Sequence, residues 1–128
     1  MELKANNIYF SYNKKREILK DFSLSINSNQ IIGLMGDSGS GKSTLCKILA
    51  GYITHYSGKV TLDGNEIPDR GFYPVQLIFQ HPEKTMNPKW KMDKVLNESW
   101  TPSKDLKDTF GLKDSWLTRW PSELSGGE

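Results

Sequence analysis

Residues 36–44 restrict the fold more than any other part of this sequence. They read Gly-Asp-Ser-Gly-Ser-Gly-Lys-Ser-Thr, and positions 36–43 match the pattern G-x-x-x-x-G-K-[ST]. The apolar segment 31–35 stands before this loop and predicts a buried strand. Leu45, Ile48 and Leu49 follow it at the spacing of one helix face. A strand, a glycine-rich turn and a helix in this order predict an α/β fold.

The residue types of this loop indicate phosphate binding. Glycines allow unusual backbone angles, so that backbone N–H groups approach phosphate oxygens, and the following helix turns its positive end toward the same anion. Lys42 is expected to reach the β- and γ-phosphates, and the Ser43 hydroxyl to bind Mg²⁺. A chance match over a chain of this length is expected in well under about one per cent of cases. The predicted nucleotide-binding residues here are Gly36, Asp37, Ser38, Gly39, Ser40, Gly41, Lys42, Ser43 and Thr44.

Length and charge exclude several other classes of protein. The 128 residues make one ordinary domain or part of a larger one, and the net charge of +2 comes from well-mixed charges. No nucleic-acid surface is therefore expected. The single cysteine, Cys46, allows no internal disulfide and fits a reducing compartment. No apolar run is long enough for a membrane span or a signal peptide.

Further strands are expected on both sides of the loop and its helix. Segment 3–12 mixes apolar and polar residues, and segment 18–26 alternates them with a period of two, as a half-buried strand does. Segment 59–62 predicts a short strand, and the apolar segment 75–79 predicts another that ends before Pro82.

Two glycines mark expected boundaries. Gly51 stands where the helix after the loop should end in a left-handed cap. Gly64 follows Asp63 in an Asp-Gly pair, which is typical of a hairpin turn. Asp63 could be mistaken for a Mg²⁺-binding acid, but its place before Gly64 favours a structural role in the turn.

The last third of the chain has a different character. Segments 92–100 and 103–110 look helical, and Ser103 is a plausible helix start. All four tryptophans lie in this part, and they fit either a small helical core or a docking surface for a partner. These tryptophans are Trp90, Trp100, Trp116 and Trp120.

The order of three motifs resembles the nucleotide-binding domain of ATP-binding cassette (ABC) proteins. A phosphate loop is followed by Gln80 after an apolar segment and then by Leu-Ser-Gly-Gly-Glu at 124–128, which is similar to the signature sequence of that family. The resemblance covers the whole chain. It implies a partial P-loop core with an antiparallel β subdomain and a helical subdomain, truncated at the signature. The expected division is about 1–83, 84–123 and 124–128.

The resemblance also implies roles for individual residues. Tyr12 matches the aromatic that stacks on adenine, although a strand-end aromatic with a structural role is the alternative. Gln80 matches a catalytic glutamine that contacts Mg²⁺ and the attacking water; Lys42 is the other expected catalytic residue. The signature residues are expected to contact the ATP that is bound by a second, head-to-tail domain. They are Leu124, Ser125, Gly126, Gly127 and Glu128.

A finer resemblance concerns the transport class. Ile-Phe-Gln-His-Pro at 78–82, Asn87-Pro88, and Pro-Ser-Glu-Leu at 121–124 are similar to the ATPases of oligopeptide, dipeptide and nickel importers. The resemblance implies ATP and Mg²⁺ as cofactors, and a second ABC ATPase domain, membrane permease subunits and a solute-binding protein as partners. It implies a place at the cytoplasmic face of the membrane and no nucleic-acid partner.

The family pattern also contains groups that match nothing in this chain. They are a Mg²⁺-binding Asp, a water-activating Glu and a switch His; His55 and His81 stand at the wrong positions. The sequence therefore resembles the N-terminal half of the domain, and we expect it to bind nucleotide weakly or not at all and not to turn ATP over. The alternatives are a soluble ABC-family ATPase of translation or repair and a non-catalytic truncated product. A small-molecule kinase would require an accidental signature.

Overall fold

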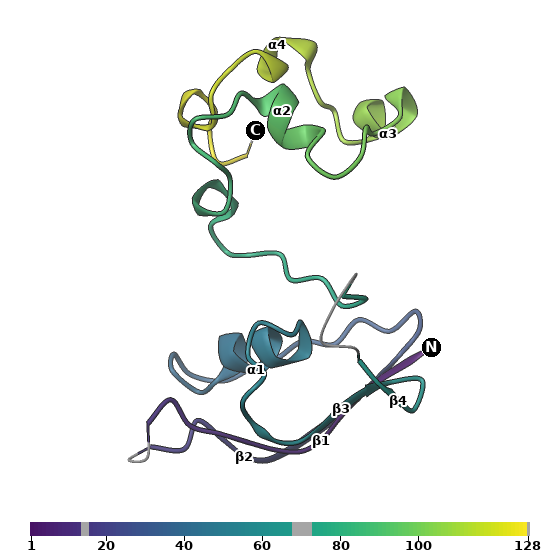
Figure 1. Cartoon of the computed structure of the whole chain (residues 1–128), viewed down its shortest axis with the longest axis vertical. Helices are drawn as coiled ribbons and strands as arrows, with labels where there is room; N and C mark the ends of the chain where they lie inside the picture. The colour runs from purple at the N-terminus through teal and green to yellow at the C-terminus, as the bar shows by residue number, and fades with distance from the viewer. Residues whose placement is uncertain (14–15, 68–72, 128) are drawn as a thin grey trace. The chain divides into compact units, whose positions relative to one another are not determined.

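The computed structural model describes residues 1–13, 16–67 and 73–127. The chain divides into two compact units, Met1–Leu77 and Ile78–Glu128 (Figure 1). Each unit is described by itself below. The predicted three-part division of the chain stays a prediction.

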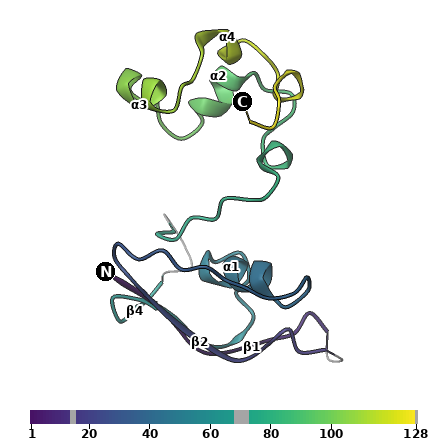
Figure 2. The same ribbon diagram turned by 180° about the vertical axis from the view of Figure 1, so that it is seen from behind.

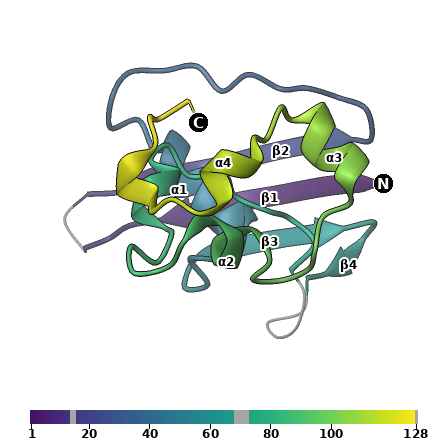
Figure 3. The ribbon, with the colours of Figure 1, turned by 90° about the horizontal axis from the view of Figure 1, so that it is seen from above.

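The first unit is built on an antiparallel sheet (Figure 3). Its strands are β1 (Glu2–Phe10), β2 (Leu19–Asn27), β3 (Ser57–Leu62) and β4 (Asn65–Glu66), in the order β2-β1-β3-β4. The predicted antiparallel β part of the fold and the strands expected at 3–12, 18–26 and 59–62 are confirmed.

An irregularity in β1 decides which side chains enter the core. Ala5 and Ile8 are both buried, although they are three residues apart and a regular strand would place them on opposite faces. Asn7 between them has a φ of 47°, and the pairing register with β2 shifts at this point. The shift turns Ile8 back to the core face, where it is fully buried.

The helix α1 (Lys42–Leu49) covers one face of this sheet (Figure 1). Leu45 and Ile48 are buried and pack in one cluster with Ala5, Ile8 and Val60 of the strands. The cap residue is Ala50, and Gly51 follows with a φ of 73°. The predicted helix and its left-handed glycine end are therefore confirmed.

The Asp63-Gly64 pair forms the predicted hairpin turn. Asp63 and Gly64 have φ values of 50° and 78°, which is the pattern of a type I′ turn between β3 and β4. The Asp63 Oδ1 accepts a hydrogen bond from the backbone N–H of Glu2 at 2.6 Å. This contact confirms a structural role for Asp63.

Two predicted strands are absent from the part of the chain that the structure describes. Residues 31–35 run from β2 toward α1 as irregular backbone (Figure 2), and residues 75–79 are irregular as well. Ile31, Met35 and Ile78 are almost fully exposed, with relative exposures of 101%, 96% and 91%. A strand requires hydrogen bonds to a neighbouring strand, and no described segment pairs with either of these two. The apolar composition of these two segments was therefore not enough to predict a strand.

The second unit consists of short helical segments. They are the 3₁₀ turns η1 (Pro82–Lys84) and η2 (Pro121–Glu123) and the helices α2 (Met92–Leu96), α3 (Lys104–Thr109) and α4 (Asp114–Leu117). Ser103 caps α3 as predicted, because its Oγ accepts a hydrogen bond from the Leu106 N–H. The helix predicted over 92–100 ends at Leu96, where the Asn97 side chain donates back to the Asp93 carbonyl at 2.8 Å.

None of the four tryptophans of this unit is buried, and two of them are exposed. Pro102 is the only buried residue among those described at 78–127, and Trp100 and Trp120 are 60% and 41% exposed. The Lys94 ammonium lies 4.1 Å from the ring centroid of Trp90, in cation–π geometry. The burial pattern gives no support to a tryptophan core, and the docking surface stays a prediction.

Candidate functional site

The side chain of Lys42 crosses the glycine-rich loop. Its Nζ donates hydrogen bonds to the backbone carbonyls of Gly36 at 2.6 Å and Asp37 at 2.8 Å, and it lies 3.3 Å from the Ser40 Oγ. Lys42 is the first residue of α1, so the same helix start fixes the cation and the backbone N–H groups of its first turn. Positive charge is therefore concentrated at this point of the first unit.

Three glycines of this loop, Gly36, Gly39 and Gly41, have positive φ angles that favour glycine. Gly39 and Gly41 have φ values of 81° and 97°, in the left-handed region that other residues rarely adopt. Gly41 also lies against β2 and the residue before it, because a Cβ there would approach Leu19 Cδ2 at 3.0 Å and Ile18 Cγ2 at 3.1 Å. A methyl group on Gly39 would meet no described atom within 4 Å. The loop thus rests on β2 at Gly41 and is open at Gly39.

Tyr12 lies beside the start of α1. Its hydroxyl is 3.2 Å from the Oγ1 of Thr44, and the Thr44 side chain is buried. The Tyr12 ring stands edge-to-face on Phe10, with 4.7 Å between the ring centroids. The ring nevertheless remains 61% exposed. The structure therefore brings the predicted adenine-stacking residue next to the predicted phosphate loop.

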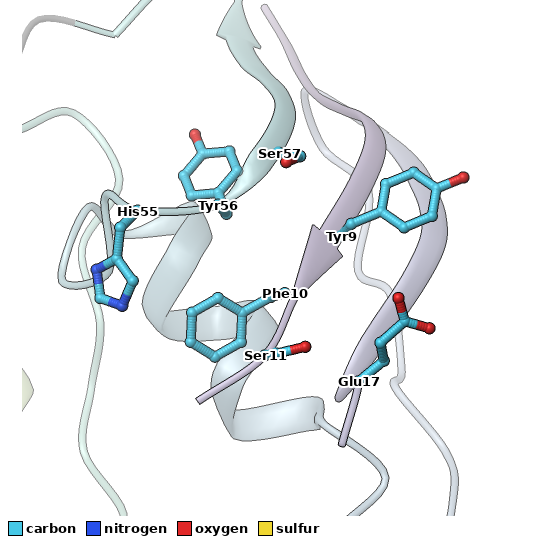
Figure 4. A pocket seen from close by; sticks show the side chains of 7 residues that line it. All are labelled: Tyr9, Phe10, Ser11, Glu17, His55, Tyr56 and Ser57. Atoms are coloured by element: carbon cyan, nitrogen blue, oxygen red, sulfur yellow. The ribbon is translucent and has the colours of Figure 1, made fainter. Parts of the chain in front are cut away.

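A pocket of about 470 Å³ opens next to the end of β1 (Figure 4). Phe10 and His55 lie on one side of it, with 5.6 Å between their ring centroids, and Tyr9 and Glu17 lie on the other. Burial raises the pKa of Tyr9, and the nearby carboxylates of Asp21 and Glu17 raise it further. The pocket therefore combines an aromatic wall with a negatively charged edge.

Gln80 and the signature residues lie together in the second unit. Gln80, Leu124, Ser125, Gly126 and Gly127 line one pocket of about 810 Å³. The apolar part of its wall comes from proline and methionine side chains, namely Pro82, Met86, Pro88, Met92 and Pro121. Sequence reasoning gave these two groups separate roles and did not predict a shared pocket.

The predicted site residues are divided between the two units. Those at 12 and 36–44 belong to the first unit, whereas Gln80 and 124–127 belong to the second, and Glu128 lies outside the described residues. Ser38 and Ser43 have exposed side chains at the loop. The ring contact between Phe10 and Tyr12 was not predicted. Tyr12 lies beyond the end of β1, so strand periodicity does not place the two rings together.

Among the residues that the structure describes, no three His, Cys, Asp or Glu side chains converge in a way that could hold a metal ion. No described helix is long and apolar enough to cross a membrane.

Comparison with known families agrees with the motif order. The family model described as "ABC transporter" matches residues 19–128. The chain belongs to the ABC transporter family. The matched region includes both the glycine-rich loop ahead of α1 and the Leu-Ser-Gly-Gly sequence at 124–127.

Individual proteins and a solved structure are also similar to this chain. The chain is 34% identical to the nickel import system ATP-binding protein NikE of Staphylococcus aureus strains RF122 and N315, over 98% of this chain and 56% of the relative. It therefore spans about half the length of these curated relatives. The dimeric structure of a bacterial ABC transporter cassette is similar with a TM-score of 0.69 and 20% identity, over 97% of this chain and 63% of that one. These similarities support the ABC-type fold predicted from the sequence.

Proposed function

We propose that this chain is the nucleotide-binding part of an ABC transporter ATPase, and that residues 36–44 bind the phosphates of ATP. The observation that carries the proposal is the position of Lys42 Nζ, 2.6 Å from the Gly36 carbonyl, across a loop whose glycines adopt left-handed angles. A cation held over an open glycine loop at a helix start suits a polyphosphate ligand.

The residues of the loop fit Mg²⁺–ATP in chemical character. Lys42 would exchange its two carbonyl partners for phosphate oxygens, and the exposed Ser43 hydroxyl would hold Mg²⁺. Bound Mg²⁺ would supply charge neutralisation for the phosphates. Tyr12 would offer its exposed ring face to the base. Gln80 would assist at Mg²⁺ and at the attacking water, as the family resemblance implies.

We further propose that the whole protein hydrolyses ATP to drive solute import. The similarity to nickel import ATP-binding proteins favours a nickel or related importer, with peptides as the other solute class. In this proposal the protein works at the cytoplasmic face of the membrane, bound to permease subunits that receive solute from a binding protein. The exposed tryptophans Trp100 and Trp120 would belong to the surface that docks on the permease.

The signature residues would act on a second copy or a paralogous domain. Ser125, Gly126 and Gly127 offer a hydroxyl and flexible backbone N–H groups to an anion. The family resemblance implies a head-to-tail pair in which each signature faces the other domain's phosphate loop. A similar cassette has a dimeric structure, which agrees with a pair of domains. The shared pocket of Gln80 and the signature would then join the catalytic glutamine to the dimer interface.

Calorimetric titration with Mg²⁺–ATP tests the binding proposal. The loop geometry narrows the sequence expectation of weak binding or none. We now expect weak, saturable binding by the 128-residue protein and none by Lys42→Ala. Lys47→Ala is the matched control, because Lys47 lies in the last turn of the same helix, away from the loop. Equal binding by wild type and Lys42→Ala, or loss of binding in Lys47→Ala alone, would contradict a phosphate site at Lys42.

A further inference from the structure

A side-chain hydrogen bond joins the segment just after β1 to the first turn of α1. The Tyr12 hydroxyl and the Thr44 Oγ1 are 3.2 Å apart, and these residues are 32 positions apart in the sequence. The Thr44 side chain is 7% exposed, whereas Tyr12 is 61% exposed. The buried partner is thus fixed by its helix, and the exposed partner is the one that the bond restrains.

Two contacts together define the orientation of the Tyr12 ring. Phe10 meets it edge-to-face at an interplanar angle of 88°, and Thr44 holds its hydroxyl. A ring pinned at its side and at its tip loses the rotational freedom of an ordinary surface tyrosine. Its exposed area then forms a preorganised flat surface beside the loop that Lys42 crosses.

A flat aromatic surface beside a phosphate cradle is suited to a ligand that carries both a planar base and phosphates. A base can stack on the ring only when the ring is suitably oriented. Inorganic polyphosphate has no base, so the orientation of the ring does not affect its binding. Thr44 lies two residues after Lys42 in α1, so that the same turn of helix carries the phosphate-binding cation and the anchor of the ring.

We infer that Thr44 is a positioning residue for base recognition, which acts by hydrogen bonding to Tyr12 and so couples the base-stacking ring to the phosphate-binding helix. This inference rests on the proposed nucleotide site. It assigns to the Thr44 side chain the selection of a nucleoside triphosphate over bare polyphosphate. The loop itself supplies affinity for both.

The inference predicts that the preference for a nucleoside triphosphate over polyphosphate depends on a side-chain hydroxyl. Thr44→Val and Tyr12→Phe each remove one end of the same hydrogen bond and keep the shape of the side chain. Thr44→Ser keeps the hydroxyl. If the bond positions the ring, either single substitution has the same effect, and the double variant adds nothing further.

The test compares the affinities of the 128-residue protein for Mg²⁺–ATP and for Mg²⁺–tripolyphosphate, measured by calorimetry. We expect the ATP-to-tripolyphosphate affinity ratio to fall about 2- to 10-fold in Thr44→Val and in Tyr12→Phe, the effect of one hydrogen bond. Thr44→Ser should keep the wild-type ratio, and the double variant should equal either single one. A general loss of stability would lower both affinities and leave the ratio unchanged.

Several results would overturn the inference. They are an unchanged ratio in Tyr12→Phe, additive losses in the double variant, and equal affinity of wild type for the two ligands. Tyr12→Phe alters an exposed side chain, so it serves as the deciding variant if Thr44→Val fails to fold. If wild type binds neither ligand, the proposed nucleotide site is itself wrong. If wild type binds both but the ratio never changes, only the role of Thr44 is wrong.

Discussion

The Lys42 ammonium lies 2.6 Å from the carbonyl oxygen of Gly36, six residues earlier in the chain. With the second bond to Asp37, this contact closes the loop around its own cation. A hydrogen bond from a charged donor is stronger than a neutral one. The loop is therefore held together by the group that we propose for phosphate binding.

Removal of this cation should loosen the loop before any ligand is added. In Lys42→Ala we expect the amide hydrogens of residues 36–41 to exchange about two- to tenfold faster than in wild type, since two charge-assisted bonds are lost. Hydrogen exchange with mass spectrometry measures the change. Lys47→Ala, on the same helix, should leave the exchange of these amides as it is. Unchanged exchange in Lys42→Ala would show that the bonds do not order the loop.

Gly39 and Gly41 both have left-handed backbone angles, but they should differ in their tolerance of alanine. Gly39→Ala should cost about 1 kcal/mol of unfolding free energy, because only its backbone conformation is strained. Gly41→Ala should cost about 2 to 3 kcal/mol, because its methyl group would also press on Leu19 and Ile18. Chemical denaturation of both variants provides the comparison. A larger cost at Gly39 than at Gly41 would mean that the loop does not rest on β2 as described.

The β3–β4 hairpin should lose a small stabilisation in acid. The hydrogen bond and charge of Lys59, whose Nζ is 2.7 Å from the Glu66 Oε1, lower the pKa of Glu66 below its ordinary value of 4.5. A carboxylate whose pKa is lowered by folding stabilises the fold above its ordinary pKa, and this contribution is lost as the pH falls through the lowered value.

Thermal unfolding as a function of pH measures this effect. Wild type should unfold at a slightly higher temperature than Glu66→Gln at neutral pH, and the difference should vanish at a pH well below 4.5. The pair is exposed to solvent, so the difference should be small and should shrink in salt. A difference that grows in acid would contradict the pairing.

We expect the 128-residue chain to bind nucleotide without steady hydrolysis. The family resemblance assigns no residue of 1–128 to the Mg²⁺-binding acid, to the water-activating glutamate or to the switch histidine, and phosphoryl transfer depends on such positioned groups. A phosphate-release assay with Mg²⁺–ATP measures turnover. Steady phosphate release that is absent in Lys42→Ala would contradict this expectation.

Sequence reasoning predicted the elements that depend on local patterns. Four predicted features are each determined by residues close together in the chain, and the structure contains all of them. They are the alternation of apolar and polar residues in β2, the i, i+3, i+4 spacing of apolar residues in α1, the Asp63-Gly64 turn and the Ser103 cap. The strand expected at 31–35 was wrong because a strand depends on a partner elsewhere in the chain.

The candidate site residues were predictable only where they belong to a local sequence pattern. The glycine loop and Lys42 follow from a contiguous motif. The hydrogen bond between Tyr12 and Thr44 joins residues far apart in sequence, and no local pattern contains that information. The pocket that unites Gln80 with residues 124–127 also arises only from the folded second unit.

Hydrogen exchange of the wild-type protein with and without saturating Mg²⁺–ATP tests the central claim most directly. The account predicts slower exchange in residues 36–44, at the loop and the first turn of α1, with the β3 amides at 57–62 unaffected as an internal reference. Unchanged exchange at 36–44, or protection confined to other segments, would contradict the proposal that this loop binds the nucleotide.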